Sequence, residues 1–587
     1  METKDLVNEV RSDFEERRNR RRSQESKWKL NIKFMSGKQN VFLDPGGDVV
    51  DERREKEVYN HIAPIIETRL AKFARVNCAV NVRPAGADEK DVNAAKLSAK
   101  IIDATLTDNN FTALSGEANY WAELTGTAFY KVVWDDAAGV KIAVCPPQEI
   151  YPDDLEAPSV SALRSIIHAK IYPVEAIYEL WGVEVEPEDV DVYGLEGDPV
   201  KVAKDENRSG YALVLERYSA PSKDEPNGRL TIVAGDKLVY DGELPYVNAA
   251  GDKRGFPFIR QCALNSPGSF FGTSLIERLI PVQRAYNAVK NRKHEFMARL
   301  SGGVYAVEDG AVDVESLEEE GFYPGRVVVY RQGSQPPVPM NPGSVPAEFR
   351  DEEDRLLEEF RRISGVSNIL NISGTGLTSM SGYALSLLLE QENARMTVTT
   401  ESIRAAVKEV SRHILRLYKQ FADKKRLVVI SGDSGAVEAV AFIGSELGGD
   451  DVVQETDSEM VESPATRKNM VLELMRYGLL SDENGMISNR NRAKIVEMLG
   501  FGNWEAAKNS EEVHLKKAER ENAEMAAGNA VEPSELDAHD LHISEHSAYA
   551  AGADVTAETL AAIEKHVRRH KILLSLSQQA AEMAKIQ

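Results

Sequence analysis

The amino-acid sequence predicts an α+β fold whose second half is predominantly helical. Short runs that alternate apolar and polar residues, separated by glycine, proline and asparagine turns, occupy residues 128–144 and 211–246. By contrast, residues 383–421 contain almost no helix-breaking residue, and helical spacing dominates much of residues 466–586. Strands are therefore expected mainly in the first half of the chain and long helices in the second.

Helices and strands are expected to mix in the first 271 residues. Helical patterns cover residues 1–36, 59–72, 91–108 and 114–125, and β patterns cover residues 128–134 and 140–144. The first helix carries a basic run, Arg17, Arg18 and Arg20–Arg22, among several glutamates. This run could contact nucleic acid, but the alternating charges favour a solvated helical face.

Two helices flanking a small insert are expected next. Residues 274–300 form the first helix, in which Pro281 either costs little or produces a kink. Residues 301–345 are rich in glycine and proline with short β patterns, and helical spacing returns at residues 346–363. A glycine-, serine- and threonine-rich loop then leads to the helix at 383–421. At 1.5 Å per residue this helix would span about 55–60 Å, which suggests the spine of an assembly.

The last part of the chain is expected to be helical apart from one β-hairpin after residue 425. The helical segments are residues 466–477, 489–499, 506–527 and 556–586, with a break near Pro533.

Charge and composition indicate a soluble protein that does not grip nucleic acid over its whole surface. The chain has 94 acidic and 71 basic side chains and a formal net charge of −23, whereas duplex binding requires basic side chains against phosphates. An acidic wall would nevertheless let DNA slide past. The three cysteines form no disulfide framework, and we find neither a signal peptide nor a membrane span, so we expect assembly in the host cytoplasm.

No enzyme signature is present, so we predict no enzymatic activity and no cofactor. A packaging ATPase needs a glycine-rich loop ending in Gly-Lys-Ser/Thr. The only Gly-Lys pair, Gly37 and Lys38, is followed by Gln39 and lacks the upstream glycine. The serine-hydrolase elbow, the zinc-protease helix and the kinase signatures are also missing.

A histidine-rich segment near the C-terminus is the best remaining chemical candidate. His542 and His546, like His566 and His570, are four residues apart and share a helical face. Residues 542–546 spell H-x-x-E-H, with Glu545 in the place of a general base. No third ligand follows, so helices packing through hydrogen-bonded imidazoles, or a solvated polar face, are the simpler interpretations. We assign no metal ligand here, and a metal site stays an open alternative.

Several segments resemble the portal proteins of tailed bacteriophages, most of all those of short-tailed phages. The similar segments are YNHIAPIIETRLAK (59–72), YWAELTGTAFYKVVW (120–134), FGTSLIERLIPVQRAYNAVKN (271–291), ISGVSNIL (363–370) and MSGYALSLLLEQ (380–391). In the third segment, Gly272, Ser274, Gln283 and Asn287 stand at the characteristic positions. The order of elements agrees with this family too, and the resemblance covers roughly residues 25–425.

The resemblance implies a portal fold with wing, stem, clip and crown regions. The wing would be residues 1–271, the first stem helix 272–300, the clip 301–345 and the second stem helix 346–363. The channel loop would be residues 364–382, followed by the long helix and remaining wing at 383–465. The crown would be residues 466–530, and residues 531–587 would be a helical extension, either a barrel or part of a plain crown.

The resemblance also implies function, location and partners. The protein would form a dodecameric ring at one capsid vertex of the virion, where double-stranded DNA passes during packaging and ejection. Its expected partners are the terminase large subunit, a tail adaptor or head-completion protein, and the major capsid and scaffolding proteins, with no membrane. Two alternatives stay open: another head-tail connector or scaffold protein, and a metal-dependent nuclease or protease that uses the C-terminal histidines.

The candidate site residues follow from these regions. In the channel loop they are Thr375, Leu377, Thr378, Ser379 and Met380, which could contact phosphates without charge. On the first stem helix they are the basic residues Arg284, Lys290, Arg292, Lys293 and Arg299. In the clip they are Tyr305, Tyr323, Arg326 and Tyr330. In a ring, these basic residues would form a belt that faces either DNA phosphates or neighbouring subunits. Because the second stem helix is acidic, we favour attraction between the two helices across subunit boundaries over contact with DNA.

Overall fold

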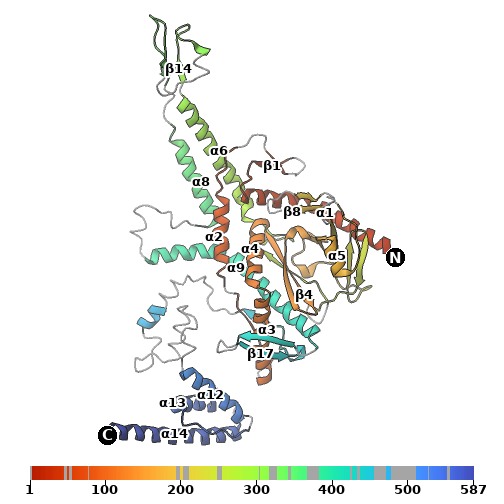
Figure 1. Cartoon of the computed structure of the whole chain (residues 1–587), viewed down its shortest axis with the longest axis vertical. Coiled ribbons are helices and arrows are strands. Elements are labelled where there is room, and N and C mark those ends of the chain that lie inside the picture. Colours follow the sequence, from red (N-terminus) through yellow and green to blue (C-terminus); the bar gives the residue numbers. More distant parts are fainter. Residues whose placement is uncertain are drawn as a thin grey trace. The chain divides into compact units, whose positions relative to one another are not determined.

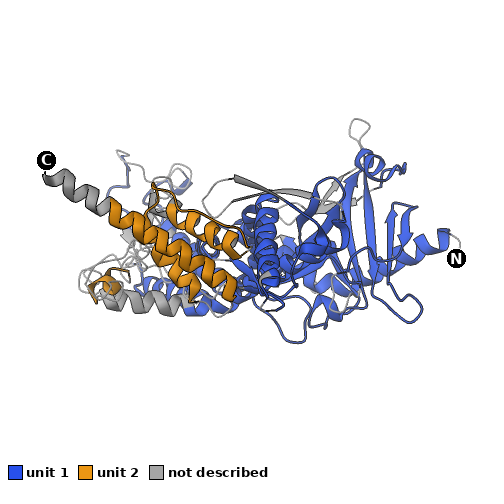
Figure 2. Cartoon of the chain, turned by 90° about the horizontal axis from the view of Figure 1, so that it is seen from below, with its two compact units in different colours: residues 1–430, 437–461 blue, residues 431–436, 462–587 orange. Residues whose placement is uncertain are grey.

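The computed structural model describes most of the chain. The described residues are 3–44, 49–51, 56–76, 78–86, 88–188, 190–193, 199–202, 210–247, 254–302, 304–315, 327–340, 345–366, 382–423, 426–431, 437–454, 471–477, 510–526, 528–551 and 556–586. Two compact units are distinguished in Figure 2: a body unit, residues 1–430 and 437–461, and a C-terminal unit, residues 431–436 and 462–587. Figure 1 labels their elements.

Two antiparallel sheets organise the body unit. The larger has the order β12-β11-β10-β7-β6, and the smaller has the order β13-β4-β5. Their strands are β4 (Thr127–Asp135), β5 (Gly139–Cys145), β6 (Ile150–Pro152), β7 (Ser165–Pro173), β10 (Tyr211–Ser219), β11 (Arg229–Ala234), β12 (Lys237–Gly242) and β13 (Phe258–Cys262). The sequence patterns predicted β4, β5, β10, β11 and β12 but not β6, β7 or β13. The last three are short or buried on both faces, as the pattern of β13 shows, so they carry little alternation.

Short two-stranded sheets lie outside these two larger sheets. They are β1 (Val41–Leu43) with β2 (Val49–Asp51), β8 (Val190–Tyr193) with β9 (Pro199–Val202), β14 (Val304–Ala306) with β15 (Val338–Met340), β16 (Arg426–Ser431) with β17 (Val437–Phe442), and β3 (Val80–Val82) with β18 (Val452–Gln454). The last pair joins segments about 370 residues apart, and the sequence analysis placed no strand after the hairpin. A three-residue strand carries too little periodicity to be recognised.

The helices of the body unit lie close to their expected positions. They are α1 (Thr3–Met35), α2 (Ile62–Phe73), α3 (Glu89–Asp108), α4 (Phe111–Thr125), α5 (Val174–Trp181), α6 (Leu275–Gly302), α8 (Glu348–Ser364) and α9 (Gly382–Phe421). Helix α6 continues through Pro281, which falls in its second turn. Among the helices in the described part of the chain, none is long and apolar enough to cross a membrane.

Helix α9 is the central packing element of the body unit. Its 40 residues correspond to about 60 Å. The C-terminal half buries Val407, Val410 and Ile414 in a core shared with β4, β5 and β13. This core continues to Phe442 on β17 and Val452 on β18, so late segments of the chain complete the domain begun by the early ones.

The arginine run on α1 is a solvated face only in part, because Arg20 and Arg22 are exposed as expected while two of the arginines are buried. Arg17 and Arg21 are only 5 % and 1 % exposed. Arg21 donates hydrogen bonds to the carbonyls of Pro147 and Gln148 at 2.9 and 2.8 Å, and its guanidinium lies 3.6 Å from the centre of the Tyr151 ring. The expectation was wrong for these two arginines because strand-end carbonyls that the sequence does not reveal need donors when they are buried.

The C-terminal unit is helical in its described residues. Helix α13 (His539–Ala550) packs on both α12 (Ser510–Ala526) and α14 (Ala557–Ile586), and α12 also contacts α14. One unit thus joins helices from both sides of the boundary expected at residue 530. Of the helix expected at 466–477, residues 471–476 are described and helical, and the helix expected at 489–499 lies outside the described residues.

Candidate functional site at the root of helix α6

Three of the segments that resemble portal proteins, residues 59–72, 120–134 and 271–291, meet at the N-terminal end of α6. The second of them contains the turn between α4 and β4, where Gly126 has φ +88°. The backbone of Gly272 runs directly against it, and a Cβ on Gly272 would lie 2.5 Å from the carbonyl oxygen of Gly126. Both positions therefore require glycine, Gly126 for its conformation and both for the close approach of two backbones.

Hydrogen bonds hold this contact in place. The Gly272 amide donates to Thr127 Oγ1 at 2.7 Å, and the Ser274 hydroxyl donates to the Glu123 carbonyl. The Glu123 side chain accepts two hydrogen bonds from Arg69 of α2 at 2.8 and 3.0 Å, with both side chains buried. A bidentate arginine–carboxylate pair fixes orientation as well as distance, so α2, α4 and the start of α6 are held as one body.

A polar stripe on α6 grips the extended segment that precedes α2. Gln283 accepts from the His61 amide at 3.0 Å and donates to the Tyr59 carbonyl at 2.7 Å. Asn287 accepts from the Tyr59 amide at 3.1 Å. One turn further along, Asn291 accepts from the Glu57 amide at 3.1 Å and donates to its carbonyl at 2.8 Å.

This stripe explains the Gln-x-x-x-Asn spacing. Residues four apart lie on one helical face, and each side-chain amide offers both a donor and an acceptor to an extended backbone. Asn291 continues the same periodicity, although the sequence analysis did not include it.

Helices α6 and α8 form an antiparallel hairpin, with the β14–β15 pair beyond its far end (Figure 1). The rings of Tyr286 and Phe360 are 6.3 Å apart, and those of Phe296 and Phe349 are 6.1 Å apart. From the first pair to the second, the residue number rises along α6 and falls along α8, so the two helices are antiparallel. The apolar face of α8 includes the buried Leu356 and Phe360, which join the core at the base of α6.

The basic residues expected on α6 have different surroundings. Lys290 and Lys293 both contact Glu353 of α8 in the same chain, each at 3.1 Å. Partial burial disfavours the charged Glu353, but hydrogen bonds from the two lysines outweigh burial and hold its pKa below the ordinary value. The attraction between opposite charges on the two helices therefore operates, for these residues, within one chain.

The other basic residues expected on α6 have separate surroundings. The Arg284 guanidinium donates to the Val41 carbonyl at 3.0 Å and lies over the Phe34 ring. Arg292 is exposed, and the side chain of Arg299 lies outside the described part of the structure.

The clip and loop residues are described only in part. Tyr305 belongs to β14, and Tyr330 is 46 % exposed. Tyr323 and Arg326 lie outside the described residues, as do Thr375, Leu377, Thr378, Ser379 and Met380 of the expected channel loop. Near Tyr330, Val327 and Val329 are 85 % and 82 % exposed, an apolar exposure that the sequence analysis did not include.

The sequence matches the family described as phage P22-like portal protein over residues 14–470. The chain belongs to this portal family. The match spans α2, α4, α6, α8 and α9, and so includes the whole root of α6 with its hairpin. No curated protein matches the sequence. Among solved structures, it is similar to a chain in "Virion of native gene transfer agent (GTA) particle", with a TM-score of 0.34 and 11 % identity, over 74 % of this chain and 89 % of that chain.

This protein is therefore a phage portal protein, and family membership implies a ring oligomer within the phage particle. The mixture of helices and strands fits both the family and the predicted α+β class. A portal is a structural protein of the virion. Gly126, Gly272, Ser274, Gln283 and Asn287, which carried the resemblance, join α6 to the portal body.

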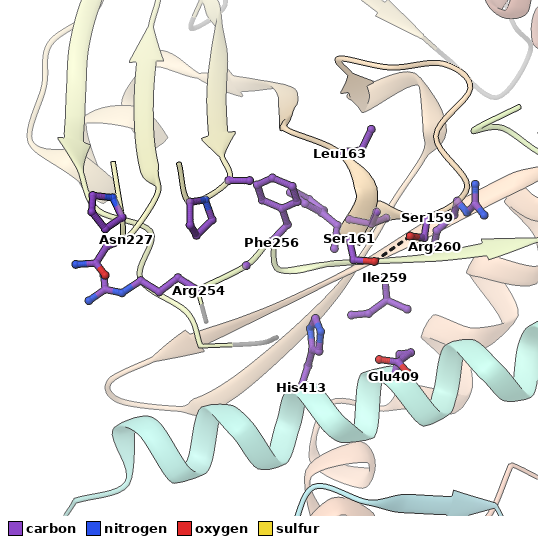
Figure 3. A pocket seen from close by; sticks show the side chains of 16 residues that line it. Ser159, Ser161, Leu163, Asn227, Arg254, Phe256, Ile259, Arg260, Glu409 and His413 are labelled. Atoms are coloured by element: carbon purple, nitrogen blue, oxygen red, sulfur yellow. Dashed lines mark hydrogen bonds between the residues drawn. The ribbon is translucent and has the colours of Figure 1, made fainter. Parts of the chain in front are cut away.

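A pocket of about 860 Å³ lies between the β13 region and α9 of the portal body (Figure 3). Its ionisable lining residues are Arg254, Arg260, Glu409 and His413. The first two donate to backbone carbonyls at 2.5 Å, and Glu409 accepts from Arg412 at 2.6 Å. Arg254, Arg260 and Glu409 are thus engaged in holding the fold, and His413 is a buried imidazole whose Nδ1 has no hydrogen-bond partner among the described residues.

The five C-terminal histidines come together in the structure. His539, His542, His546, His566 and His570 are all buried, so the expectation of a solvated polar face is wrong and the expectation of helices packing through imidazoles is correct. The carboxylate that reaches them is Glu521 of α12, at 3.0 Å from His542 Nδ1, whereas Glu545 is only half-buried. Glu521 is 21 residues before His542, and no local motif connects the two.

Proposed function

We propose that this portal forms a twelve-membered ring whose central channel passes double-stranded DNA during packaging and ejection. The α6–α8 hairpin would be the stem of the ring, and the β14–β15 region would be its clip. The observation that carries this assignment is the rigid root of α6. The Gly126–Gly272 backbone contact and the hydrogen bonds of the polar stripe hold this helix in one orientation relative to its own subunit. A ring closes only if every subunit keeps the same orientation, so a rigidly held helix suits a ring.

The exposed apolar residues of the clip support an interface there. Val327, Val329 and Val338 are 85 %, 82 % and 50 % exposed. Valine side chains in contact with water carry an unfavourable free energy that burial against another protein surface would relieve. We assign them to contacts between neighbouring subunits, with the terminase large subunit and then a tail adaptor or head-completion protein docking on the same end.

Charge supports passage of DNA without capture. The chain carries a net charge of −23, and the exposed side of α8 presents Asp351, Glu352 and Asp354. Phosphates are repelled by such a surface, so DNA would slide along it. Residues 372–382 contain no charged residue, and we propose that they contact the DNA as a channel loop that limits slippage.

The remaining assignments concern location and activity. The ring would sit at one capsid vertex, in contact with the major capsid and scaffolding proteins, after assembly in the host cytoplasm. We propose that the chain has no catalytic activity of its own, since the family is structural and packaging energy would come from the terminase.

Ring formation is tested with substitutions in the clip. The double variant Val327→Asp/Val329→Asp should fail to form rings, because two carboxylates cannot be buried in an apolar interface without partners. The readouts are native mass and electron micrographs of the purified protein. Leu180→Asp on α5, where the leucine is 61 % exposed, is the matched control. Intact rings in the double variant would contradict the assignment of the clip as an interface.

The channel loop is tested separately by deleting residues 374–380. Virions complemented with this variant should still assemble but should lose packaged DNA faster than wild type. Fully packaged and stable virions would refute the role of the loop without affecting the ring.

A further inference from the structure

The interior of the C-terminal unit is polar. Among the described residues from 510 to 586, the buried apolar side chains are Ala518, Met525, Ile563 and Val567, and the buried polar ones are Glu521, Asn522, Asp537, His539, His542, His546, Thr559, His566 and His570. In the described residues, the three helices thus bury more polar than apolar side chains, with a small apolar cluster at Met525, Ile563 and Val567. A metal ion bound among these polar groups would stabilise their packing.

Four of these side chains converge on one point. One ligand atom from each of Glu521, His546, His566 and His570 lies within 4.8 Å of the others, and all four residues are buried. The Nε2 atoms of His546 and His566 are both 3.5 Å from Glu521 Oε2, and the Nε2 atoms of His566 and His570 are 3.1 Å apart. Helices α12, α13 and α14 each contribute to the group.

The outer ring nitrogens determine which atoms point inward as acceptors. His566 Nδ1 lies 2.9 Å from the carbonyl oxygen of Val531. A carbonyl can only accept, so Nδ1 carries the proton and the neutral ring presents a lone pair at Nε2. His546 Nδ1 faces the amide oxygen of Asn522 at 2.7 Å, which fixes the same tautomer. The rings are thus oriented as metal-binding histidines are, by a hydrogen bond on the far nitrogen.

Lone pairs that face a carboxylate repel it unless a cation lies between them. His546 Nε2 is buried and has no hydrogen-bond partner. Lys517 approaches Glu521 from the other side, with its Nζ 3.6 Å from Oε1, while Oε2 faces the imidazoles and accepts from His542. A lysine outside the group therefore cannot compensate the lone pairs within it.

We propose that Glu521, His546, His566 and His570 form a zinc site that clamps the three helices of the C-terminal unit. Three imidazole nitrogens and one carboxylate oxygen are a ligand set that Zn²⁺ accepts in tetrahedral geometry. With bonds of about 2.0–2.1 Å, tetrahedral ligand atoms are about 3.3 Å apart. Three of the six pairs are already 3.1–3.5 Å apart, and all six lie within 4.8 Å, so small side-chain shifts would close the site around the ion. Four protein ligands close the coordination sphere, so the role of the ion is structural. The proposal does not depend on the ring or on DNA passage.

The site is tested first by metal analysis of the full-length protein. Protein purified without chelator and dialysed against Zn²⁺ should retain about one zinc per chain. X-ray absorption at the zinc edge should show nitrogen and oxygen ligands near 2.0 Å with the scattering pattern of about three imidazoles. Protein that retains no zinc, or zinc bound by water or sulfur, would overturn the proposal, and neither outcome depends on a variant that folds.

Variants then identify the ligands. Glu521→Gln and His566→Gln should lose the bound zinc. His539→Gln, which removes the contact of His539 Nδ1 with His570 Nδ1 at 2.9 Å, should weaken zinc binding by about ten- to a hundredfold. His294→Gln on α6, an exposed histidine of the body unit, is the control and should bind zinc as wild type does. Full zinc content in both ligand variants would contradict the assignment.

Removal of the metal should act on one unit alone. A chelator should increase hydrogen exchange in peptides covering residues 510–586 and leave peptides of the body unit unchanged, with recovery when Zn²⁺ is added back. Unchanged exchange in the C-terminal unit after complete zinc removal would show that the ion does not clamp the helices.

Discussion

The body unit and the C-terminal unit each bury a glutamate beside histidine, but they balance its charge differently. In the body, Glu216 accepts from Lys131 at 2.5 Å and from the Tyr218 hydroxyl at 2.6 Å. Burial disfavours the charged form of Glu216, yet Lys131 and His168 outweigh it and hold its pKa well below the ordinary value. In the C-terminal unit, Glu521 faces imidazole nitrogens on the side away from Lys517. In the first cluster a cation of the protein, Lys131, contacts the carboxylate directly, whereas in the second Lys517 reaches only the outer oxygen of Glu521, and the inner oxygen is where we propose the zinc ion.

The surroundings of the two clusters differ in the same way. Around Glu216, the aromatic rings of Phe258 and Tyr218 belong to an extended apolar core. Around Glu521, the apolar cluster of the described residues has three buried members, Met525, Ile563 and Val567. A large core can absorb the cost of a buried ion pair, while a small unit must gain stability from its polar groups.

The largest expected effect comes from removing the built-in cation of the body. Lys131→Met keeps the length of the side chain but leaves Glu216 without its ammonium partner, which should lower the free energy of unfolding by about 3–5 kcal/mol. Urea unfolding followed by tryptophan fluorescence reports mainly on this unit, because four of the five tryptophans, Trp28, Trp121, Trp134 and Trp181, belong to it, while Trp504 belongs to the C-terminal unit. Hydrogen exchange in the C-terminal unit should stay unchanged. A loss below 1 kcal/mol would mean that the two clusters do not differ as described.

The second prediction concerns the tightness of packing at the root of α6. Gly126→Ala places a methyl group against the Gly272 backbone at φ +88°, and the strain should cost roughly 3 kcal/mol. Gly116→Ala, in the same helix α4, is the matched control because nothing lies within 4 Å of the added carbon. The control should be stabilised by about 0.8–1 kcal/mol. Similar effects of the two substitutions on the urea midpoint would disprove the backbone contact.

The third prediction concerns how the stability of the body unit depends on pH through a single buried histidine, His413. Burial and the nearby Arg416 lower the pKa of His413 to about 3, below the ordinary value of about 6.5. The folded protein keeps His413 neutral while the unfolded chain binds a proton. Stability from this group is therefore complete above pH 6.5 and falls between pH 6.5 and 3, by up to about 1.4 kcal/mol per pH unit.

The test of this pH dependence is a difference between two proteins. Urea unfolding by tryptophan fluorescence between pH 7 and 4 should show a steeper loss for wild type than for His413→Leu. Parallel curves would show that His413 does not titrate in this way. Carboxylates contribute equally to both proteins, so they cancel in the comparison.

The smallest effect is expected at Glu353, which is buried but whose two lysine partners are partly exposed. Glu353→Gln removes the partner of Lys290 and Lys293, whose side chains are 23 % and 24 % exposed. Both lysines can then turn toward solvent, so the cost should stay below about 1 kcal/mol. A cost comparable to that of Lys131→Met would show that the α6–α8 hairpin depends on this pair.

The sequence by itself determined the α+β class, the order of the elements and the portal resemblance. Helices and strands with one buried face carry their period in the chain, so α3, α4, α6, α8 and α9 were predicted to within a few residues. The motif glycines and amides were also visible. The sequence did not show why these residues are needed, because Gly126 contacts Gly272, and Gln283 contacts Tyr59, only in the folded molecule.

Only the tertiary structure decided which polar groups share an interior. Arg21 was predicted to be solvated because the carbonyls it satisfies are more than 120 residues away along the chain. The spacing of the histidines was visible in the sequence, but Glu521, Asn522 and the Val531 carbonyl were not recognisable as their partners. Periodicity records which face of a helix is buried and not what lies against it, so the identity of the fourth ligand depends on how three helices pack.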